Sequence, residues 1–338
     1  APHLEPTTTA VVAGASGAAF ALSLSVSSPR MQHLREEPET TAAPVRQPIL
    51  AISHGGGPCF FMDDEEGMFR DINSKSTTAD WFRKWLEADG ALAEAAEAGD
   101  RAPYQRPQGI VVVSAHYEED APTVIDCGND LHKLLYDYYG FPPETYELAW
   151  PVRNSEAMVH DIEKALAEHG FPLKRNRLRG LDHGVFVPLK LALPQADIPV
   201  TQISLLASLD PDAHFQLGQA LAPLRDQGYL IVCSGQVTHS LSSFRLEADP
   251  EDVDPRFRAF TDWFDTLVTS KDISPEMRRE MLLQWELQAP HARLVHPREE
   301  HLIPFIVAAG IAGGRPGKKA WDNGFVLGTL SLNAYIWA

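Results

Sequence analysis

The sequence predicts an α/β protein: a single domain with a central, mostly parallel or mixed sheet and helices on both sides. Two observations support this. Short, unbroken apolar runs of the kind that form buried strands recur along the chain, and segments with helical spacing of apolar residues separate them. There is no internal repeat and no strong linker after residue 47. In such sheets the carboxyl ends of the strands share one edge, and ligands bind there.

The predicted strands are short. The run at 109–114 is unbroken Ile and Val after its first Gly, which indicates a strand buried on both faces. Five strands are predicted at 48–53, 109–114, 123–126, 199–206 and 229–234. The C-terminal segment 325–335 is predicted to add one or two more.

The predicted helices alternate with these strands. In 155–169 the residues Met158, Val159, Ile162 and Leu166 share one face, and the glycine that follows ends the helix. An apolar segment at 185–193 is predicted to begin a helix near His183, whereas 136–150, rich in aromatic residues and proline, is predicted as a loop. The remaining helices are predicted at 78–98, 211–228, 255–269, 275–289 and 301–312.

Composition excludes some classes of partner. The chain has 338 residues and a formal net charge of −17, from 46 acidic and 29 basic side chains. This balance argues against nucleic acid or an anionic membrane as the main partner. The three cysteines form no CxxC pair, which fits a reducing compartment and hence a cytoplasmic protein.

The N-terminal segment 1–46 differs from the rest. Residues 5–30 are rich in Thr, Ala, Ser and Gly, without the basic region of a signal peptide or the unbroken apolar run of a membrane helix. We expect 1–46 to be disordered or leader-like, with a true start at Met31 as an alternative. The folded domain is expected to span 47–338.

Four histidines stand at positions where a site is expected. His54, His116 and His239 come after apolar runs, each beside small residues, and His301 lies at the entrance to a predicted helix. Any one alone is more often structural. Several imidazoles at one point indicate a transition-metal site. Because Glu300 precedes His301, two histidines and a carboxylate, the usual donors of non-haem Fe(II) oxygenases, are also available.

His183 has a different setting, between Asp182 and Gly184 at the mouth of a predicted helix. A helix N-terminus disfavours the charged imidazole, and a neutral histidine is a competent general base. An Asp/His pair that caps the helix is the alternative, and the sequence leaves both open. Dinucleotide, phosphate-loop and nucleophile-elbow motifs are absent, and the triplet Gly55–Gly57 more simply allows a tight turn.

At these residues the chain resembles the class III extradiol ring-cleavage dioxygenases, of the protocatechuate 4,5-dioxygenase β-subunit type, and in particular the branch that includes DOPA 4,5-dioxygenases. The resemblance covers residues 48–336 and rests on six motifs in family order: Ser53-His54-Gly55-Gly56-Gly57-Pro58, Val112-Val113-Ser114-Ala115-His116, Tyr139-Gly140-Phe141-Pro142, Leu181-Asp182-His183-Gly184, Ser234-Gly235 with Thr238-His239-Ser240-Leu241, and Glu300-His301-Leu302-Ile303-Pro304.

The resemblance implies that 47–338 is a catalytic domain that opens a catechol ring with O2 to give a muconic semialdehyde. His54, His116, His239 and His301 would bind the metal, with Glu300 as a competing ligand. His183 would be the acid/base, a role also open to His239. The metal would be Fe(II) for turnover, with Zn(II) as an alternative ion. The implied partners are a small catechol and O2, and a homo-oligomer is compatible with this.

The chain departs from the family pattern around the ring-binding region. Phe186 stands where the family commonly has Trp, and Tyr136 stands where a His is usual. Tyr139 and Phe186 are therefore candidate substrate-binding residues, with ordinary core aromatics as the alternative. Two other functions remain open at this point: a Zn(II) hydrolase with the same ligands, and a non-enzymatic relative that binds a protein partner.

Overall fold

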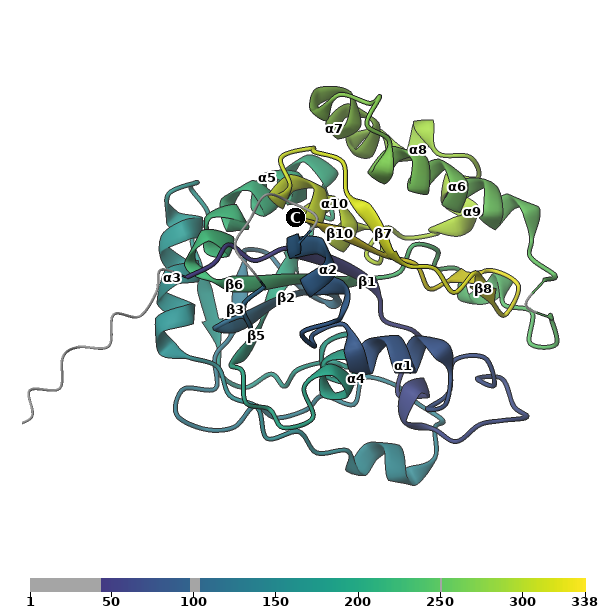
Figure 1. Cartoon of the computed structure of the whole chain (residues 1–338), viewed down its shortest axis with the longest axis horizontal. Coiled ribbons are helices and arrows are strands. Elements are labelled where there is room, and N and C mark those ends of the chain that lie inside the picture. Colours follow the sequence, from purple (N-terminus) through teal and green to yellow (C-terminus); the bar gives the residue numbers. More distant parts are fainter. Residues whose placement is uncertain (1–43, 98–103, 250) are drawn as a thin grey trace, which may run out of the picture. The chain divides into compact units, whose positions relative to one another are not determined.

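The computed structural model describes residues 44–97, 104–249 and 251–338. Residues 1–43, where the sequence predicts disorder or a leader, lie outside the described residues. The described chain contains an eight-stranded sheet in the order β4-β3-β5-β2-β6-β1-β10-β7, with helices on both faces (Figure 1). The α/β prediction with a mostly parallel or mixed sheet is confirmed.

The middle of the sheet is parallel. β1 (Ile49–Ser53) and β2 (Gly109–Glu119) both pair in parallel with β6 (Tyr229–Gly235), and β2 also pairs in parallel with β5 (Val200–Leu206). The carboxyl ends of these four strands therefore lie at one edge. His54 directly follows β1, and His116 lies in the last part of β2.

The outer strands are short, and several are antiparallel. β3 (Thr123–Ile125) pairs antiparallel with β5 and parallel with β4 (Lys174–Asn176). On the other side, β10 (Ala334–Trp337) pairs antiparallel with β1 and with β7 (Lys318–Trp321). The sequence does not predict β4 and β7, because these mostly polar edge strands lack an apolar pattern. A separate hairpin is formed by β8 (Phe325–Val326) and β9 (Leu330–Ser331).

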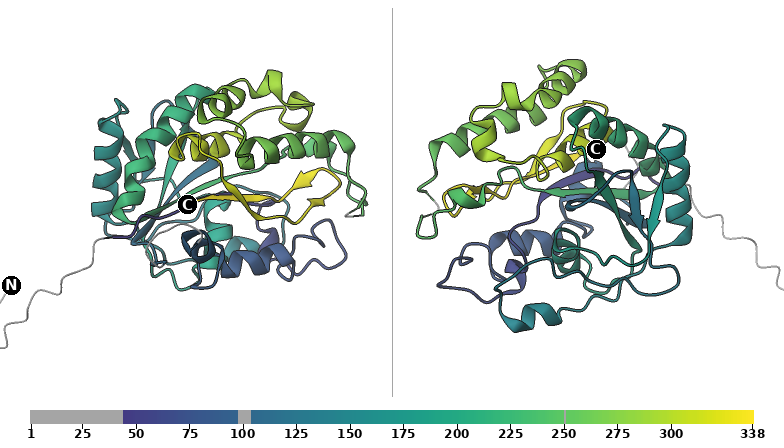
Figure 2. Two further views of the ribbon diagram at one scale, coloured as in Figure 1. Left: turned by 45° about the horizontal axis from the view of Figure 1, so that its top comes forward. Right: turned by 180° about the vertical axis from the view of Figure 1, so that it is seen from behind.

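Alternate residues of the central strands fill two cores. Ile49 and Ala51 of β1 belong to one apolar cluster, and Leu50 and Ile52 belong to the other, as the alternation of a strand requires. Figure 2 shows the two helical layers. One core is covered by α3 (Glu156–Ala167), α5 (Pro211–Leu221), α6 (Pro255–Thr269), α7 (Pro275–Leu283) and α10 (Ile303–Ile311); the other by α1 (Thr77–Lys84), α2 (Ala91–Glu97) and α4 (His183–Ala192).

Three predicted helices are interrupted. The segment 78–98 is divided at Gly90, where a Cβ would lie 2.1 Å from the backbone oxygen of Lys84. The segment 211–228 changes after α5 to a 3-10 helix, η3 (Ala222–Gln227), because Pro223 cannot donate a helical hydrogen bond. In 275–289, Gln284 leaves the helical conformation between α7 and α8 (Trp285–Gln288). The remaining short helices are η1 (Cys59–Phe61), η2 (Pro143–Glu147), η4 (Leu241–Ser243) and α9 (Ala292–Val295).

β2 is longer than its predicted range of 109–114. Val113 pairs with Ile203 on β5, whereas Glu118 pairs with Leu205, so β2 carries extra residues at this irregularity. His116 lies within that stretch rather than beyond the end of the strand.

No helix in the described ranges has the length and apolar character needed to cross a membrane. The fully buried α10 has nine residues, about half of the ~20 that a bilayer requires.

Candidate metal centre

Three imidazoles meet at the carboxyl edge of the sheet. The Nε2 atom of His116 lies 3.1 Å from Nε2 of His54 and 3.3 Å from Nε2 of His301. The three histidines offer ligand atoms that all lie within 4.8 Å of one another. They come from the end of β1, the end of β2 and the turn before α10, so three distant parts of the sequence build one cluster.

The end of β6 positions His54. The backbone N–H of His54 donates to Gly235 O at 3.1 Å, and Ser234 Oγ lies 2.9 Å from His54 Nδ1. Ser234 donates its only hydroxyl hydrogen to Gly184 O, at 2.5 Å. Its oxygen therefore accepts from the Nδ1–H of His54, which leaves the Nε2 lone pair of His54 directed at the cluster.

The same strand end positions His301. The backbone N–H of Gln236 donates to His301 O at 3.0 Å. A Cβ on Gly235 would lie 2.2 Å from His301 O, so only glycine allows this approach. Glu300 Oε1 lies 2.9 Å from His301 Nδ1 and accepts its hydrogen, which again leaves Nε2 facing the other imidazoles.

His116 completes the set. Its Nδ1 faces Asp137 Oδ2 at 3.7 Å, and its backbone oxygen accepts from Arg179 Nη2 at 2.7 Å. Each of the three histidines thus turns Nε2 to a shared centre and Nδ1 to an oxygen. Imidazoles that bind transition metals are oriented in this way, so the residues fit a divalent metal ion.

The electrostatics of the cluster suit a cation. Burial lowers the pKa of His54 and of His301 well below the ordinary value, and nearby histidines add to the effect. Burial also lowers the pKa of His116, to about 3. Burial opposes ionisation of Glu300, but its contacts with His239 and Arg298 hold the pKa of that carboxyl below its ordinary value. The site therefore offers neutral imidazoles beside a carboxylate.

His239 lies next to this centre. Its ring stacks on His301 with centroids 3.5 Å apart, and its Nδ1 lies 3.5 Å from Glu300 Oε1. The ligand atoms of His239 group with those of Glu300 and His301, whereas those of His54 and His116 group with His301. Glu300 faces the Nδ1 atoms of two histidines. A ligand role for His239 or Glu300 stays a prediction.

His183 lies beside the centre at the first position of α4, as predicted. Its ring centroid is 4.1 Å from that of His116, and its Nδ1 donates to Asp137 Oδ1 at 2.8 Å. Asp182 occupies the N-cap position of α4, but its side chain makes no cap hydrogen bond, so the alternative of side-chain capping is wrong. Asp182 is buried instead, and it accepts hydrogen bonds from Ser114 Oγ at 2.8 Å and from Gln202.

The sequence alone does not predict a role for Asp137 or Ser234. Ser234 begins the motif that leads to His239, and Asp137 stands two residues before Tyr139. Nothing in their spacing distinguishes them, because their partners are distant in sequence.

The two predicted substrate-binding residues have opposite environments. Tyr139 is 89% exposed, and Phe186 is fully buried. The Phe186 ring packs edge-on against Tyr136, at 5.9 Å, and Tyr136 donates its hydroxyl hydrogen to Leu148 O at 2.7 Å. Tyr136 therefore links the loop before η2 to the residue after it, Leu148, and to α4. Substrate contacts of Tyr139 and Phe186 remain predictions.

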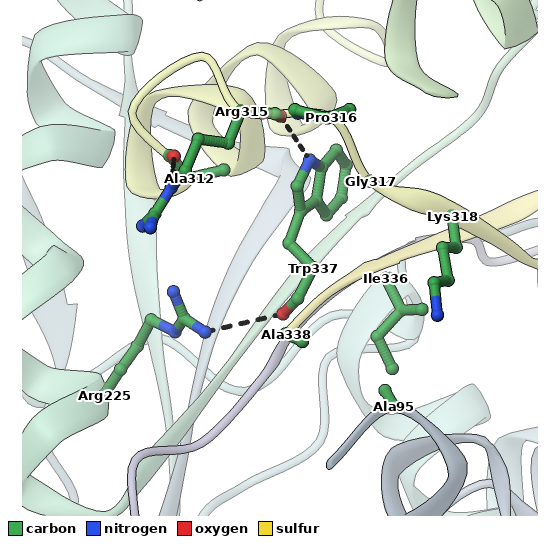
Figure 3. Close-up of a pocket in the computed structure, with 10 residues that line it drawn as sticks. All are labelled: Ala95, Arg225, Ala312, Arg315, Pro316, Gly317, Lys318, Ile336, Trp337 and Ala338. Atoms are coloured by element: carbon green, nitrogen blue, oxygen red, sulfur yellow. Dashed lines mark hydrogen bonds between the residues drawn. The ribbon is translucent and has the colours of Figure 1, made fainter. Parts of the chain in front are cut away.

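A separate cavity of about 150 Å³ lies elsewhere in the sheet (Figure 3). Arg225 lines it and donates to Trp337 O, and the indole of Trp337 donates to Arg315 O at 3.1 Å. Trp337 pairs with Ile49 at the beginning of β1, whereas His54 follows the end of that strand. This cavity is therefore at the opposite edge from the histidines.

Comparison with known proteins identifies the class. Residues 57–331 match the family described as the catalytic LigB subunit of aromatic ring-opening dioxygenase. The chain belongs to this family and is an oxidoreductase of the extradiol ring-opening type. The match contains His116, His183, His239 and His301. Dioxygenases of this family depend on a metal, in agreement with the histidine cluster.

Individual relatives lie in the same branch. The chain is 38% identical over 232 residues to the 4,5-DOPA dioxygenase extradiol of Beta vulgaris, covering 68% of this chain and 83% of that protein. It is 35% identical over 301 residues to the dioxygenase tasH of Hapsidospora irregularis, covering 86% and 85%. A crystal structure of an uncharacterized Escherichia coli K12 protein has a TM-score of 0.64 and 25% identity, covering 87% of this chain and 100% of that one.

Proposed function

We propose that this protein is an Fe(II)-dependent extradiol dioxygenase that opens the ring of a DOPA-like catechol. Both atoms of O2 enter the product, a muconic semialdehyde, so no external reductant is needed. The observation that carries the proposal is the convergence of three Nε2 atoms beside the His183–Asp137 pair. The similarity to proteins named 4,5-DOPA dioxygenase extradiol supports the choice of substrate class.

His54, His116 and His301 would hold the ion. When bound, the ion supplies a positive charge that favours ionised catechol oxygens and brings the two reactants together. Iron is favoured over zinc because the reaction consumes O2, and Zn(II) has no redox chemistry. Zn(II) would still fit the imidazole donors.

Protons would be moved by His183. Its Nδ1 is engaged by Asp137, so its Nε2 is the nitrogen available to a catechol hydroxyl. His239 is the second candidate, because its side chain is 20% exposed and its ring lies against His301. His54 and His301 are almost completely buried, so a substrate would approach from the side of His116 and His239.

The test is oxygen uptake by anaerobically Fe(II)-loaded protein with L-DOPA, caffeate and protocatechuate, with absorbance read in parallel. We expect one O2 consumed per catechol and a yellow ring-opened product, most rapidly with L-DOPA. The His301→Ala protein, loaded in the same way, is the control for free iron. Absence of uptake despite confirmed iron occupancy would refute the proposal and favour a Zn(II) hydrolase.

His183→Ala separates proton transfer from metal binding. We expect this variant to keep Fe(II), because His183 is not among the three converging ligands, and to lose about 10²–10⁴-fold in kcat. His54→Ala should instead lose the metal. Iron content by elemental analysis and kcat by oxygen electrode distinguish the two, and a fully active His183→Ala enzyme would contradict the assigned role.

A further inference from the structure

Asp137 contacts two of the clustered histidines, His183 and His116. Its Oδ1 atom accepts from His183 Nδ1 at 2.8 Å and from the backbone N–H of His183 at 2.9 Å. Its Oδ2 atom faces His116 Nδ1 at 3.7 Å. One carboxylate thus contacts the proposed acid/base through one oxygen and a proposed metal ligand through the other.

The backbone holds Asp137 in this position. A parallel bridge joins Leu134 to Leu181, the backbone N–H of Leu135 donates to Leu181 O at 2.7 Å, and that of Leu181 donates to Lys133 O at 2.9 Å. These bonds hold the two segments side by side, so Asp137 and His183, which follow the bridge within three residues, are brought together by the backbone.

The neighbouring aromatic residues fix the loop beyond Asp137. Tyr138 donates its hydroxyl hydrogen to Thr145 O at 2.7 Å, and this bond ties the segment that contains Asp137 to η2. The Tyr138 ring meets the His183 ring edge-on, with centroids 6.0 Å apart. Because Asp137 has 19% of its side chain exposed and His183 has 7%, little room is left for either to rotate.

We infer that Asp137 is the positioning residue for His183: it holds the imidazole in the tautomer with hydrogen on Nδ1, so that the basic Nε2 faces the substrate. The inference rests on the proposed function of His183. Asp137 contacts imidazoles and does not itself touch the reacting atoms in this proposal. It also replaces the missing side-chain cap of α4, because it accepts the first backbone N–H of that helix.

Asp182, the other carboxylate beside His183, cannot serve this purpose. Its oxygens are engaged by Ser114, Gln202 and Arg179, and none of its hydrogen bonds reaches the His183 ring. It therefore provides a matched comparison: an adjacent, buried acid of the same size with no hydrogen bond to the imidazole.

The first experiment needs neither metal nor substrate. Two-bond ¹H–¹⁵N spectra of metal-free, ¹⁵N-histidine-labelled protein report the tautomer, and the His183 signals are identified by their loss in His183→Ala. We expect a single Nδ1–H tautomer in the wild type and in Asp182→Asn, and a mixture in Asp137→Ala. Asp137→Asn keeps an acceptor oxygen and should restore the wild-type pattern. Unchanged His183 signals in Asp137→Ala would overturn the inference.

The second experiment uses Fe(II)-loaded enzyme and L-DOPA. Asp137→Ala should lower kcat about 10–100-fold with iron content near that of the wild type, and Asp137→Asn should recover part of the loss. In a His183→Ala background, Asp137→Ala should cause no further loss, because it acts through the absent ring. A full additional loss, or loss of iron, would show that Asp137 acts through His116. If no catechol is cleaved at all, the proposed function fails, and the spectra alone decide the role of Asp137.

Discussion

Gly235 contacts the backbone of two proposed metal ligands, His54 and His301. It ends β6, accepts from the backbone of His54, and lies so close to His301 that a Cβ would be 2.2 Å from its carbonyl oxygen. Because the obstruction is backbone, no side-chain rotation can relieve it. Gly235 therefore couples the positions of two proposed ligands.

We expect Gly235→Ala to displace His301 and weaken metal binding by at least about 10-fold, since a ligand would leave its place. Zn(II) titration against a chromophoric chelator measures this. Gly170→Ala is the control: Gly170 has a φ of +80° but no atom within 4 Å of an added Cβ. It should lose some stability and keep its metal affinity. Equal affinities in the two variants would contradict the coupling.

Ser234 is the second decisive residue, because its hydroxyl sets the tautomer of His54. Ser234→Ala removes the acceptor for His54 Nδ1 and the donor to Gly184 O. Loss of such an orienting partner typically costs about 10–100-fold in metal affinity, and we expect a loss in that range here. The same Zn(II) titration applies. Ser204→Ala, which alters a buried serine bonded to the backbone of Thr123, should leave affinity unchanged.

At the scale of elements, α5 and α10 approach each other closely. A Cβ on Gly310 would lie 2.2 Å from Phe215 O, and one on Gly218 would lie 2.2 Å from Val307 O. The two helix backbones are therefore in contact through a pair of glycines. This contact seats α10, the helix that follows the His301 turn.

Gly310→Ala should force these helices apart and lower the free energy of unfolding by about 1–3 kcal/mol, the usual cost of overpacking a core. Urea denaturation of the metal-free protein measures the change without a contribution from bound ion. Ala309, beside Gly310 in α10, is buried in the same apolar core and already carries a Cβ. Ala309→Gly thus tests the opposite change, and a larger loss there would contradict the argument.

Elements with strong patterns were predictable from sequence, and those governed by tertiary contacts were not. The apolar runs of β1 and β6 and the amphipathic α3 lie close to their predicted bounds, and β2 begins at its predicted residue. The extension of β2 past Ser114 and the strands β4 and β7 depend on neighbours that the local sequence does not reveal. The clustered histidines can also be picked out in the sequence. Asp137 cannot, because it is brought to His183 by the bridge between Leu134 and Leu181.

For the whole molecule, buried histidines make stability depend on pH. Burial lowers the pKa of His132 and His214, and lowers that of His296 to about 4. The Nε2 of His296 donates to Val237 O at 2.8 Å, as a neutral ring can. His132 and His214 hydrogen-bond to the backbone of β5, and His296 hydrogen-bonds to the segment that follows β6.

We expect the protein to lose stability as pH falls below about 6.5. In that range the unfolded chain binds protons that the folded chain does not, so stability rises with pH, by on the order of 1.4 kcal/mol per pH unit for each such group. For His296 the loss continues down to its folded pKa of about 4. Urea midpoints at pH 7 and pH 5 should differ less in His296→Gln than in the wild type. His160→Gln, at an exposed position, should keep the wild-type difference.

The order of the strands has a consequence for how the chain is made. β1 lies between β6 and β10, and it is synthesised long before either. The nascent chain therefore emerges with an apolar strand whose neighbours in the sheet have not yet been synthesised. His54 reaches its contacts only after Ser234 and then His301 have been synthesised. A ribosome-bound fragment ending before β6 cannot assemble the three imidazoles. Because the proposed ligands include His301, we expect the ion to bind only after nearly the whole sheet has been completed.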